Sequence, residues 1–259
     1  MSKAYNSEDG DSMIKVYSDH GSLPMVAHEK AMARAVMMFG IPTPLVGTLY
    51  SDGNAYGLDF ERIVGKRSLA RIISEEPERL EEIAREFARM CKQLHNTPCD
   101  TAVFPSRSAL YREHILSCKA IDDNIRQKMT AYMDTLPETT TCIHGDMQIG
   151  NIINNGKENL WIDLGDFSYG NPMLDFGMTY FQMCVLPEDH IQKLYHITKA
   201  QAQQVWDILI DEYFKPQSAE ETQAIEGQIQ KICAIHMTYL DSLGGLFDFM
   251  LRFIKEQFA

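Results

Sequence analysis

Three short strand patterns between residues 140 and 170 interrupt a chain that is otherwise helical from about residue 66 onward. They are TTCIH at 140–144, NIINN at 151–155 and LWIDLG at 160–165, and each is rich in β-branched or apolar side chains. The last two patterns flank Asn155-Gly156, a dipeptide typical of tight hairpin turns. The chain is therefore expected to carry a strand-and-loop insert, including one hairpin, within a helical region.

The first 65 residues have a different pattern, that of strands around one helix. The stretch SMIKVYS at 12–18 alternates apolar and polar side chains as a strand does. Residues 23–40 read as a helix that starts near Pro24 and ends at Gly40. Residues 41–65 read as two strands joined by the turn signal SDGN. This part of the chain is expected to form a small β-rich lobe.

Helical periodicity dominates the rest of the chain. The clearest case is the segment 74–97, in which apolar side chains recur every three or four positions after Pro77. Further helical patterns cover roughly 107–118, 122–134, 173–184, 198–213 and 220–255. The order of elements predicts an α+β chain with two lobes, a β-rich N-terminal lobe at 1–64 and a larger helical C-terminal lobe at 65–259.

Composition limits the classes of protein that the chain can belong to. The 259 residues are 45% hydrophobic, which is enough for a sizeable core. The polar start MSKAYNSEDGDS is not a signal peptide, and no apolar run approaches the ~18–20 residues that span a bilayer. The six cysteines are scattered without a C-x-x-C pair, which is typical of reduced thiols. We therefore expect a cytoplasmic protein that does not contact a membrane.

The formal net charge of −12 argues against nucleic acid as a partner, because nucleic-acid binding requires basic patches that neutralise phosphates. An acidic surface can attract a cationic substrate. However, many proteins carry such a charge for solubility alone, and this is the more common reason for it.

The stretch CIHGDMQIGNII at 142–153 places three polar side chains, His144, Asp146 and Asn151, on a loop between two strands. The predicted hairpin brings Asn151 close to Asp163, which follows the strand at 160–162. Amide and carboxylate oxygens side by side suit Mg²⁺ and its bound phosphates. Asp146 is then a further carboxylate that can take a proton from a hydroxyl group. Asp and Asn also favour turns, but their spacing here favours catalysis.

The same residues match the order of parts in enzymes that transfer phosphoryl groups. In these enzymes a loop H-R-D-x-x-x-x-N precedes a metal-binding aspartate in D-F-G, and here the parts are H-G-D-M-Q-I-G-N and Asp163-Leu164-Gly165. The pattern also requires a strand lysine for the phosphates and a helix glutamate that holds the lysine. Lys15 and Glu29 fit these roles in residue type, order and spacing.

The linked motifs resemble the aminoglycoside phosphotransferase and choline kinase family of small-molecule kinases. The family pattern is H-G-D-x-x-x-x-N, then I-D, then G-[DN]-P-x-x-D, and the last of these is G-N-P-M-L-D at 170–175 here. The segments GIPTPLV and FERIVGKRSL also resemble the entry to the small lobe's strands and the hinge. The resemblance implies a bilobal protein-kinase-like fold. It also implies a Mg²⁺-dependent transfer of the γ-phosphate of ATP or GTP to a hydroxyl group of a small molecule.

The resemblance also implies roles for the matching residues. Asp146 is the expected catalytic base, and Asn151 and Asp163 are the expected Mg²⁺ ligands. Lys15, paired with Glu29, is expected to contact the nucleotide phosphates.

The remaining matching positions have supporting roles. The backbone from Glu61 to Ile63 is expected to bind the nucleobase. His144 and Asp175 are expected to brace the loop, and Asp166 lies close enough to touch the metal or the substrate.

One departure from the family pattern concerns the start of the chain. The stretch MSKAYNS resembles only the end of the loop that follows the family's first strand, so the small lobe is expected to lack that strand. Ser2 is then a candidate for a remaining phosphate contact. A shortened lobe also motivates an alternative function, a nucleotide-binding pseudokinase or regulatory protein without transfer activity. A protein kinase is disfavoured by Gly145 in place of arginine and by the lack of an A-P-E segment after Asp163.

Substrate specificity is expected to lie in the helical region after residue 185, where acidic and aromatic side chains such as Glu226 and His236 are candidates. Aminoglycosides, choline-like alcohols, sugars and amino alcohols all fit. The sequence leaves open the oligomeric state, the choice between ATP and GTP, and any role in antibiotic resistance.

Overall fold

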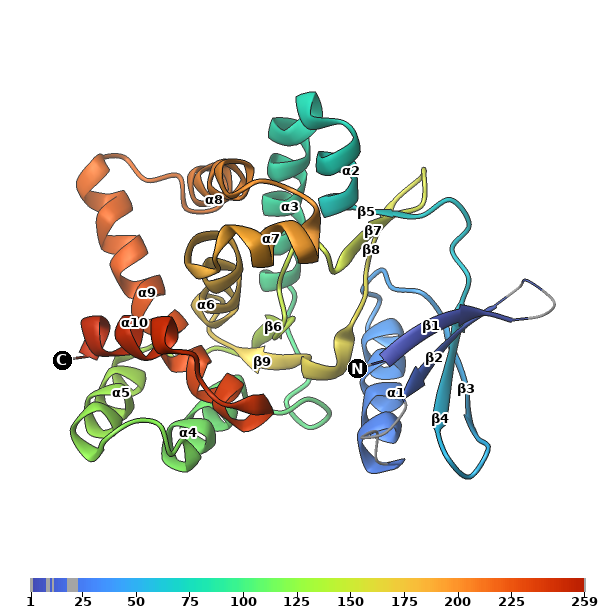
Figure 1. The fold of residues 1–259 in the computed structure, drawn as a ribbon, viewed down its shortest axis with the longest axis horizontal. Helices are drawn as coiled ribbons and strands as arrows, with labels where there is room; N and C mark the ends of the chain where they lie inside the picture. The colour runs from blue at the N-terminus through green and yellow to red at the C-terminus, as the bar shows by residue number, and fades with distance from the viewer. Residues whose placement is uncertain (1, 8–9, 11, 18–22, 259) are drawn as a thin grey trace. The chain divides into compact units, whose positions relative to one another are not determined.

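The computed structural model describes residues 2–7, 10, 12–17 and 23–258, without the side chains of residues 2, 3 and 243 (Figure 1). The chain divides into two compact units. The first contains the residues up to Leu69 together with Ile149–Phe167, and the second contains Ala70–Gln148 together with the residues from Ser168 onward. The predicted lobe boundary between residues 64 and 65 stays a prediction.

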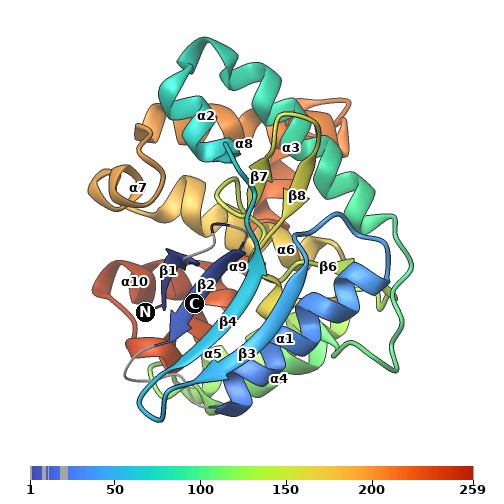
Figure 2. The same cartoon turned by 90° about the vertical axis from the view of Figure 1, so that its right-hand side faces the viewer.

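A four-stranded antiparallel sheet forms the main part of the first unit (Figure 2). Its strands, in spatial order, are β1 (Ser2–Asn6), β2 (Ser12–Tyr17), β4 (Tyr56–Glu61) and β3 (Val46–Ser51). Helix α1 (Leu23–Met38) packs against β3 and β4. Tyr17, Val26 and Leu58 are buried together and form one core cluster of this unit.

A second, three-stranded sheet in the first unit contains the predicted hairpin. Its order is β5 (Arg67–Ser68), β7 (Ile152–Asn154) and β8 (Asn159–Trp161). Gly156 in the turn has a φ of 87°, a left-handed conformation that glycine adopts without strain. A 3-10 turn at Leu164–Asp166 follows β8 and packs on α1. The hairpin around Asn155-Gly156 is therefore confirmed.

Residues Ser2–Asn6, which we expected to be the end of a loop, instead form strand β1. The strand pairs with β2 from Ser2↔Tyr17 to Asn6↔Met13. This edge strand is defined by backbone pairing with a neighbour, which the side-chain pattern of five residues does not reveal. The expected strands around 12–18 and 41–65 and the expected helix at 23–40 are present, and Gly40 ends α1 with a φ of 83°.

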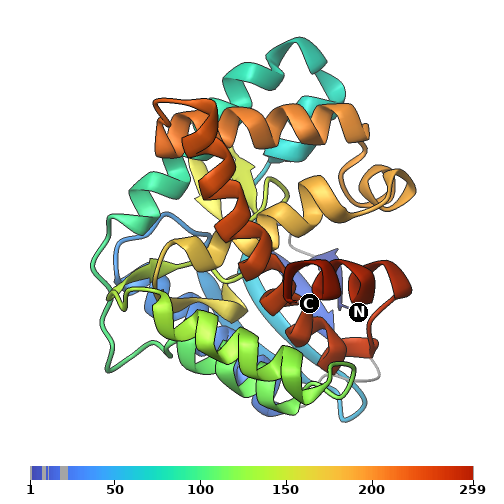
Figure 3. The ribbon, with the colours of Figure 1, turned by 90° about the vertical axis from the view of Figure 1, so that its left-hand side faces the viewer.

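The second unit is mainly helical (Figure 3). Its elements are α2 (Leu69–Glu75, which begins at the last residue of the first unit), a 3-10 turn (Pro77–Arg79), α3 (Leu80–His95), α4 (Arg107–Ser117), α5 (Asp123–Thr135), β6 (Thr141–Ile143), β9 (Ser168–Gly170), α6 (Met173–Tyr180), a π-helical turn (Phe181–Val185), α7 (Glu188–Tyr195), α8 (Lys199–Phe214), α9 (Ala219–Gly244) and α10 (Asp248–Phe258). Helix α3 packs on α8, and α9 packs on α4, α6 and α10. Strands β6 and β9 pair as an antiparallel ribbon.

The helical patterns were predicted well where they are long, and less well where they are short or broken. The single pattern at 220–255 is in fact two helices, α9 and α10, because the chain turns at Gly245 with a φ of 88°. Helices α2 and α7, of seven and eight residues, were not predicted. Short helices carry too few turns for a clear periodicity.

The fold class is the expected one, a mixed α+β chain with an antiparallel N-terminal sheet and a helical C-terminal part. No helix among the described residues has both the length and the apolar character that crossing a bilayer requires.

Candidate functional site

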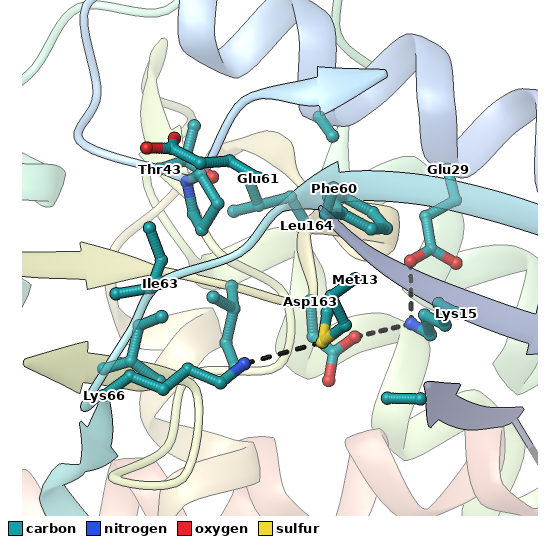
Figure 4. Close-up of a pocket in the computed structure, with 15 residues that line it drawn as sticks. Met13, Lys15, Glu29, Thr43, Phe60, Glu61, Ile63, Lys66, Asp163 and Leu164 are labelled. Carbon is teal, nitrogen blue, oxygen red and sulfur yellow. Dashed lines mark hydrogen bonds and ion pairs between the residues drawn. The ribbon is translucent and has the colours of Figure 1, made fainter. Parts of the chain in front are cut away.

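Lys15 is the centre of an ion-pair cluster in the first unit (Figure 4). Its Nζ lies 2.7 Å from Oε1 of Glu29 on α1 and 2.7 Å from Oδ1 of Asp163, two residues beyond β8. Burial by itself lowers the pKa of Lys15, but the charges of Asp163 and Glu29, with their hydrogen bonds, outweigh it and raise the pKa. Lys15 is therefore held as an ammonium ion between two carboxylates that lie 14 and 148 residues away in the sequence.

Glu29 is fixed by a second contact from the same strand. The Tyr17 hydroxyl donates a hydrogen bond to Glu29 Oε2, at an O–O distance of 2.5 Å. Tyr17 follows Lys15 by two residues and therefore projects from the same face of β2. Burial, followed by the Glu29 carboxylate, raises the pKa of Tyr17, which keeps the phenol protonated as a donor. Both oxygens of Glu29 are thus engaged, and the carboxylate positions Lys15.

Asp163 has a left-handed backbone, with φ and ψ both 57°, at the junction of β8 and the 3-10 turn. Asp and Asn adopt this conformation more readily than other residues with a Cβ. The junction is held by His28, whose Nε2 lies 3.1 Å from the carbonyl oxygen of Gly165. The Asp163 side chain remains half exposed, and within the described residues only its Oδ1 takes a partner. Its other oxygen is available to a cation.

Asn151 and Asp163 lie close together because of the hairpin. The Ile162 N–H donates to the Asn151 carbonyl oxygen at 2.9 Å, so Asn151 is opposite the residue before Asp163. Asn151 is a buried residue, with only 5% of its surface exposed. Asp166 ends the 3-10 turn in the same unit. Among the described residues, no three His, Cys, Asp or Glu side chains lie together in a way that could hold a metal ion. A metal ion bound here would therefore also need oxygen atoms from a bound molecule, such as those of a phosphate group.

A pocket of about 260 Å³ in the first unit contains this cluster (Figure 4). Lys15, Glu29 and Asp163 line one part of it, and apolar side chains that include Phe60 and Leu164 line the rest. Lys66, from the segment between β4 and β5, is a second cationic residue in the lining. The pocket therefore combines an apolar wall with a group of charged side chains.

The end of β4 and the segment after it line this pocket through Glu61 and Ile63. Glu61 has its N–H bonded to the Leu45 carbonyl oxygen at 2.8 Å, and its Oε2 accepts from the Leu45 N–H at 3.1 Å. Ile63 lines the pocket, and within the described part of the chain its peptide N–H and carbonyl take no hydrogen-bond partner. Of the predicted nucleobase contacts, Ile63 is thus better placed to donate than Glu61.

Asp146 lies in the second unit, where its carboxylate is engaged by amide groups. Gln148 Nε2 is 3.0 Å from both Asp146 oxygens. The Tyr195 hydroxyl donates to Gln148 Oε1 at 2.5 Å and so orients the amide. Burial, with a contribution from the Asp146 charge, raises the pKa of Tyr195. Asp146 is therefore a hydrogen-bond acceptor that is positioned by Gln148, and Gln148 is oriented in turn by Tyr195.

A second glutamine reaches Asp146 from the π-helical turn. Gln182 Nε2 lies 3.5 Å from Asp146 Oδ1, at the limit of a hydrogen bond. Its Oε1 is buried and takes no partner among the described residues. Single π-helical turns often occur at functional sites, because the extra residue re-aims a side chain. Here the turn brings a polar amide to the Asp146 carboxylate.

The loop around Asp146 is held by the buried side chain of Asp175. Its Oδ2 accepts from the His144 N–H at 2.8 Å and its Oδ1 from the Gly145 N–H at 2.7 Å. His95 Nε2 lies 3.0 Å from the same Oδ2. Burial raises the pKa of Asp175, but the His95 hydrogen bond and the other partners outweigh it and lower the pKa. His144 in turn accepts from the Asp146 N–H, through Nδ1, at 3.2 Å.

Other predicted positions are outside these clusters. The side chain of Ser2 lies outside the described residues. Two candidates for substrate contact are engaged within the protein. Glu226 accepts a hydrogen bond from Trp206 Nε1 at 2.9 Å, and His236 is buried, with 1% of its surface exposed. Gln148, Gln182 and Lys66 also line the two clusters and were not predicted from the sequence. Gln148 lies within the recognised loop, and its position was a signal that could have been used.

Most of the chain matches the model of one protein family. The model of the family described as "Phosphotransferase enzyme family" matches residues 6–208. No curated protein matches the chain by sequence.

Solved structures of similar fold include several small-molecule kinases. A thermostable mutant of aminoglycoside phosphotransferase APH(4)-Ia, in a ternary complex with ADP and hygromycin B, has a TM-score of 0.65 and 12% identity, over 99% of this chain and 92% of that one. A choline/ethanolamine kinase family protein from Mesorhizobium loti has a TM-score of 0.55 and 16% identity, over 100% and 83%. Aminoglycoside phosphotransferase APH(3'')-Id from Streptomyces rimosus, with ADP and streptomycin, has a TM-score of 0.52 and 15% identity, over 89% and 90%. At these identities the likeness establishes the fold.

Proposed function

The chain belongs to the phosphotransferase enzyme family, and on this premise we propose that it transfers the γ-phosphate of ATP or GTP to a hydroxyl group of a small molecule. The observation that carries the proposal is the ion pair between Lys15 and Asp163, 2.7 Å apart although 148 residues separate them in the sequence. A strand lysine held by a helix glutamate, beside a carboxylate that follows a hairpin, is the set that phosphoryl transfer requires.

Nucleotide binding is the first part of the proposal. The Lys15 ammonium contacts the phosphates, and Glu29 with Tyr17 holds the lysine in place. The nucleobase lies against the apolar wall and bonds to the free peptide groups of Ile63. Two of the solved structures of similar fold contain ADP, which supports a nucleotide in this fold.

Mg²⁺ fits the donor set of the first unit. Asp163 offers a half-exposed carboxylate with one oxygen unpaired among the described residues, and Asn151 offers an amide oxygen. Both are hard oxygen donors, and phosphate oxygens would complete the coordination. When bound, Mg²⁺ supplies positive charge that offsets the negative charge on the transferred group. Asp166, in the same 3-10 turn, is a further candidate for a contact with the metal or the substrate.

Asp146 is the proposed catalytic base. Its carboxylate accepts the proton of the acceptor hydroxyl as the oxygen forms a bond to the γ-phosphorus and the bond to the leaving ADP or GDP breaks. Gln148 and Tyr195 set the direction of the carboxylate. Asp175, with His95 and His144, holds the loop backbone so that this direction is kept.

A cationic acceptor is the proposed substrate class. The net charge of −12 favours a molecule that carries amino or quaternary ammonium groups. Solved structures of similar fold contain hygromycin B and streptomycin.

The test is nucleotide consumption in the presence of a panel of hydroxyl compounds, matched in size but with or without amino groups. On an acceptor that is turned over, Asp146→Asn should lower kcat by at least about 100-fold, because general base catalysis contributes roughly 10²–10⁴. Nucleotide affinity should stay within about threefold, since Asp146 is not in the pocket lining. Asp134→Asn, an exposed change on α5, is the matched control. Turnover by the Asp146 variant within a few-fold of wild type would contradict the proposal.

A second candidate is a nucleotide-binding protein without transfer activity. It is favoured by one observation, namely that both Asp146 oxygens already accept hydrogen bonds from Gln148. It predicts Mg²⁺-dependent nucleotide binding with no phosphorylated product from any acceptor, as measured by mass spectrometry. The combination of Asp146, Asn151 and Asp163 argues against it, because binding alone requires no base.

A further inference from the structure

Lys66 is a half-buried lysine in the pocket lining, and no acidic side chain among the described residues pairs with it. Among the described residues its Nζ has one hydrogen-bond partner, the thioether sulfur of Met13, at 3.6 Å (Figure 4). A thioether is a weak acceptor and cannot compensate an ammonium charge. Burial lowers the pKa of Lys66, and the nearby charge of Asp163 opposes this only in part. The side chain is therefore desolvated at a place where its charge is poorly satisfied.

The position of Met13 shows which part of the pocket Lys66 faces. Met13 and Lys15 are two residues apart on β2, so their side chains lie on the same face of the strand. The Lys66 ammonium, in contact with Met13, is therefore beside the part of the pocket that holds Lys15 and Asp163. Figure 4 shows the Lys66 side chain extending from its own backbone toward this cluster.

The charges in the pocket leave room for a second cation. Lys15 is paired with both Glu29 and Asp163, so this cluster carries a net charge of about −1 (one ammonium against two carboxylates). A nucleoside triphosphate brings several further negative charges. An anion of that kind is bound well only if additional positive charge faces it.

We infer that Lys66 is a second phosphate-binding residue, which exchanges its contact with Met13 for a phosphate oxygen of the bound nucleotide. The inference rests on the proposed nucleotide-binding function of the same pocket. It gives a role to a residue for which the sequence predicted none, on the segment between β4 and β5. The alternative is structural, with the lysine stem covering apolar surface and the ammonium reaching toward water.

The experiment is titration calorimetry of ATP, ADP and adenosine, each with Mg²⁺, into the wild-type chain and the Lys66→Met and Lys66→Arg variants. Methionine keeps the length and apolar stem of the side chain but removes the charge. We expect Lys66→Met to weaken ATP binding about tenfold or more, the range for a charge-assisted hydrogen bond. Adenosine affinity should stay within about twofold, and Lys66→Arg should retain most of the ATP affinity.

Lys157→Met is the matched control, because it removes the same charge from the exposed β7–β8 turn of the same unit, away from the pocket lining. Thermal unfolding of each variant checks that the pocket still folds. If Lys66→Met weakens ATP and adenosine equally, or leaves ATP affinity within about twofold, Lys66 is structural and the inference is wrong while nucleotide binding stands. If the wild-type chain binds none of the three ligands, the proposed function fails and the inference fails with it.

Discussion

Asp163 combines a charge and a backbone conformation that different substitutions can separate. Its left-handed φ of 57° strains most residues with a Cβ, but aspartate and asparagine tolerate it better. Its carboxylate is also one of the two partners of Lys15. The residue therefore has a local role in the turn and an electrostatic role in the pocket.

Two variants separate these roles. Asp163→Asn keeps the turn and removes the charge, whereas Asp163→Ala removes both. Nucleotide binding in the presence of Mg²⁺ should fall at least about tenfold in each variant, because a metal-binding oxygen of full charge is lost. Urea unfolding should find Asp163→Ala about 1 kcal/mol less stable than Asp163→Asn, since alanine is strained in this conformation. Equal stability of the two variants would show that the left-handed conformation carries no strain.

At the level of single residues, the sequence predicted those members of the site that belong to spaced motifs. Lys15, Glu29 and Asp163 were expected to act together, and the structure places the Lys15 Nζ 2.7 Å from one carboxylate oxygen of Glu29 and 2.7 Å from one of Asp163. Their functional roles stay predictions. Lys66 and Gln182 could not be predicted, because one reaches the pocket through its own long side chain and the other is re-aimed by a π-helical turn. Neither effect produces a motif with a recognisable residue spacing in the sequence.

At the level of elements, α6 and α9 pack closely at Gly177. A Cβ at this position would lie 2.7 Å from Ile232 Cγ2 and 3.0 Å from the Ile232 carbonyl carbon. The second of these atoms belongs to the backbone of α9, which cannot move aside easily. The glycine is thus required by the packing of two helices.

Gly177→Ala should therefore lower the free energy of unfolding by about 1–3 kcal/mol, the usual cost of overpacking. Gly227→Ala is the matched control, because a Cβ there meets no atom within 4 Å. In that helix interior alanine should raise the stability by about 0.5–1 kcal/mol. Urea unfolding of the two variants measures the difference, and a stabilising effect of alanine at position 177 would contradict the close packing.

Elements were predictable from the sequence in proportion to their length and amphipathic character. Helix α3 was clear because nine of its residues are buried along one face. Strand β1 and helices α2 and α7 were missed because they are short, with five, seven and eight residues, too few for a clear periodicity. The break between α9 and α10 occurs at a Gly-Gly pair that the continuing apolar pattern concealed.

At the level of the whole molecule, stability should depend on pH through one buried histidine. His236 is fully surrounded, with Nδ1 3.0 Å from the Tyr111 hydroxyl and no partner for Nε2 within the described residues. Burial lowers its pKa to about 3, and the charges of Arg107 and His114 act in the same direction against a smaller effect of Asp175. The folded chain therefore holds this imidazole neutral, whereas the unfolded chain protonates it below about pH 6.5.

The contribution of His236 is therefore fully present above about pH 6.5 and is lost progressively as the pH falls toward about 3. Urea unfolding at pH 7.5, 6.0 and 5.0 should show this loss in the wild-type chain and a shallower one in His236→Gln. His190→Gln, on the exposed start of α7, is the control and should behave as the wild type does. Parallel pH profiles of the wild type and the His236 variant would contradict the prediction. The three pH values of this measurement lie above the ordinary pKa of carboxylates, so the lowered pKa of Asp175 does not contribute to the difference.

The first unit is discontinuous along the chain, since it needs residues 149–167 as well as those up to Leu69. A gene fragment that stops at Leu69 would encode Lys15 and Glu29 but omit Asp163, and it would leave β5 without its neighbour β7. Ser68 pairs with Ile153, so the two pieces meet within a few residues of their ends. A single polypeptide in which a short glycine-serine bridge joins residue 69 to residue 149 would therefore contain every residue that lines the pocket.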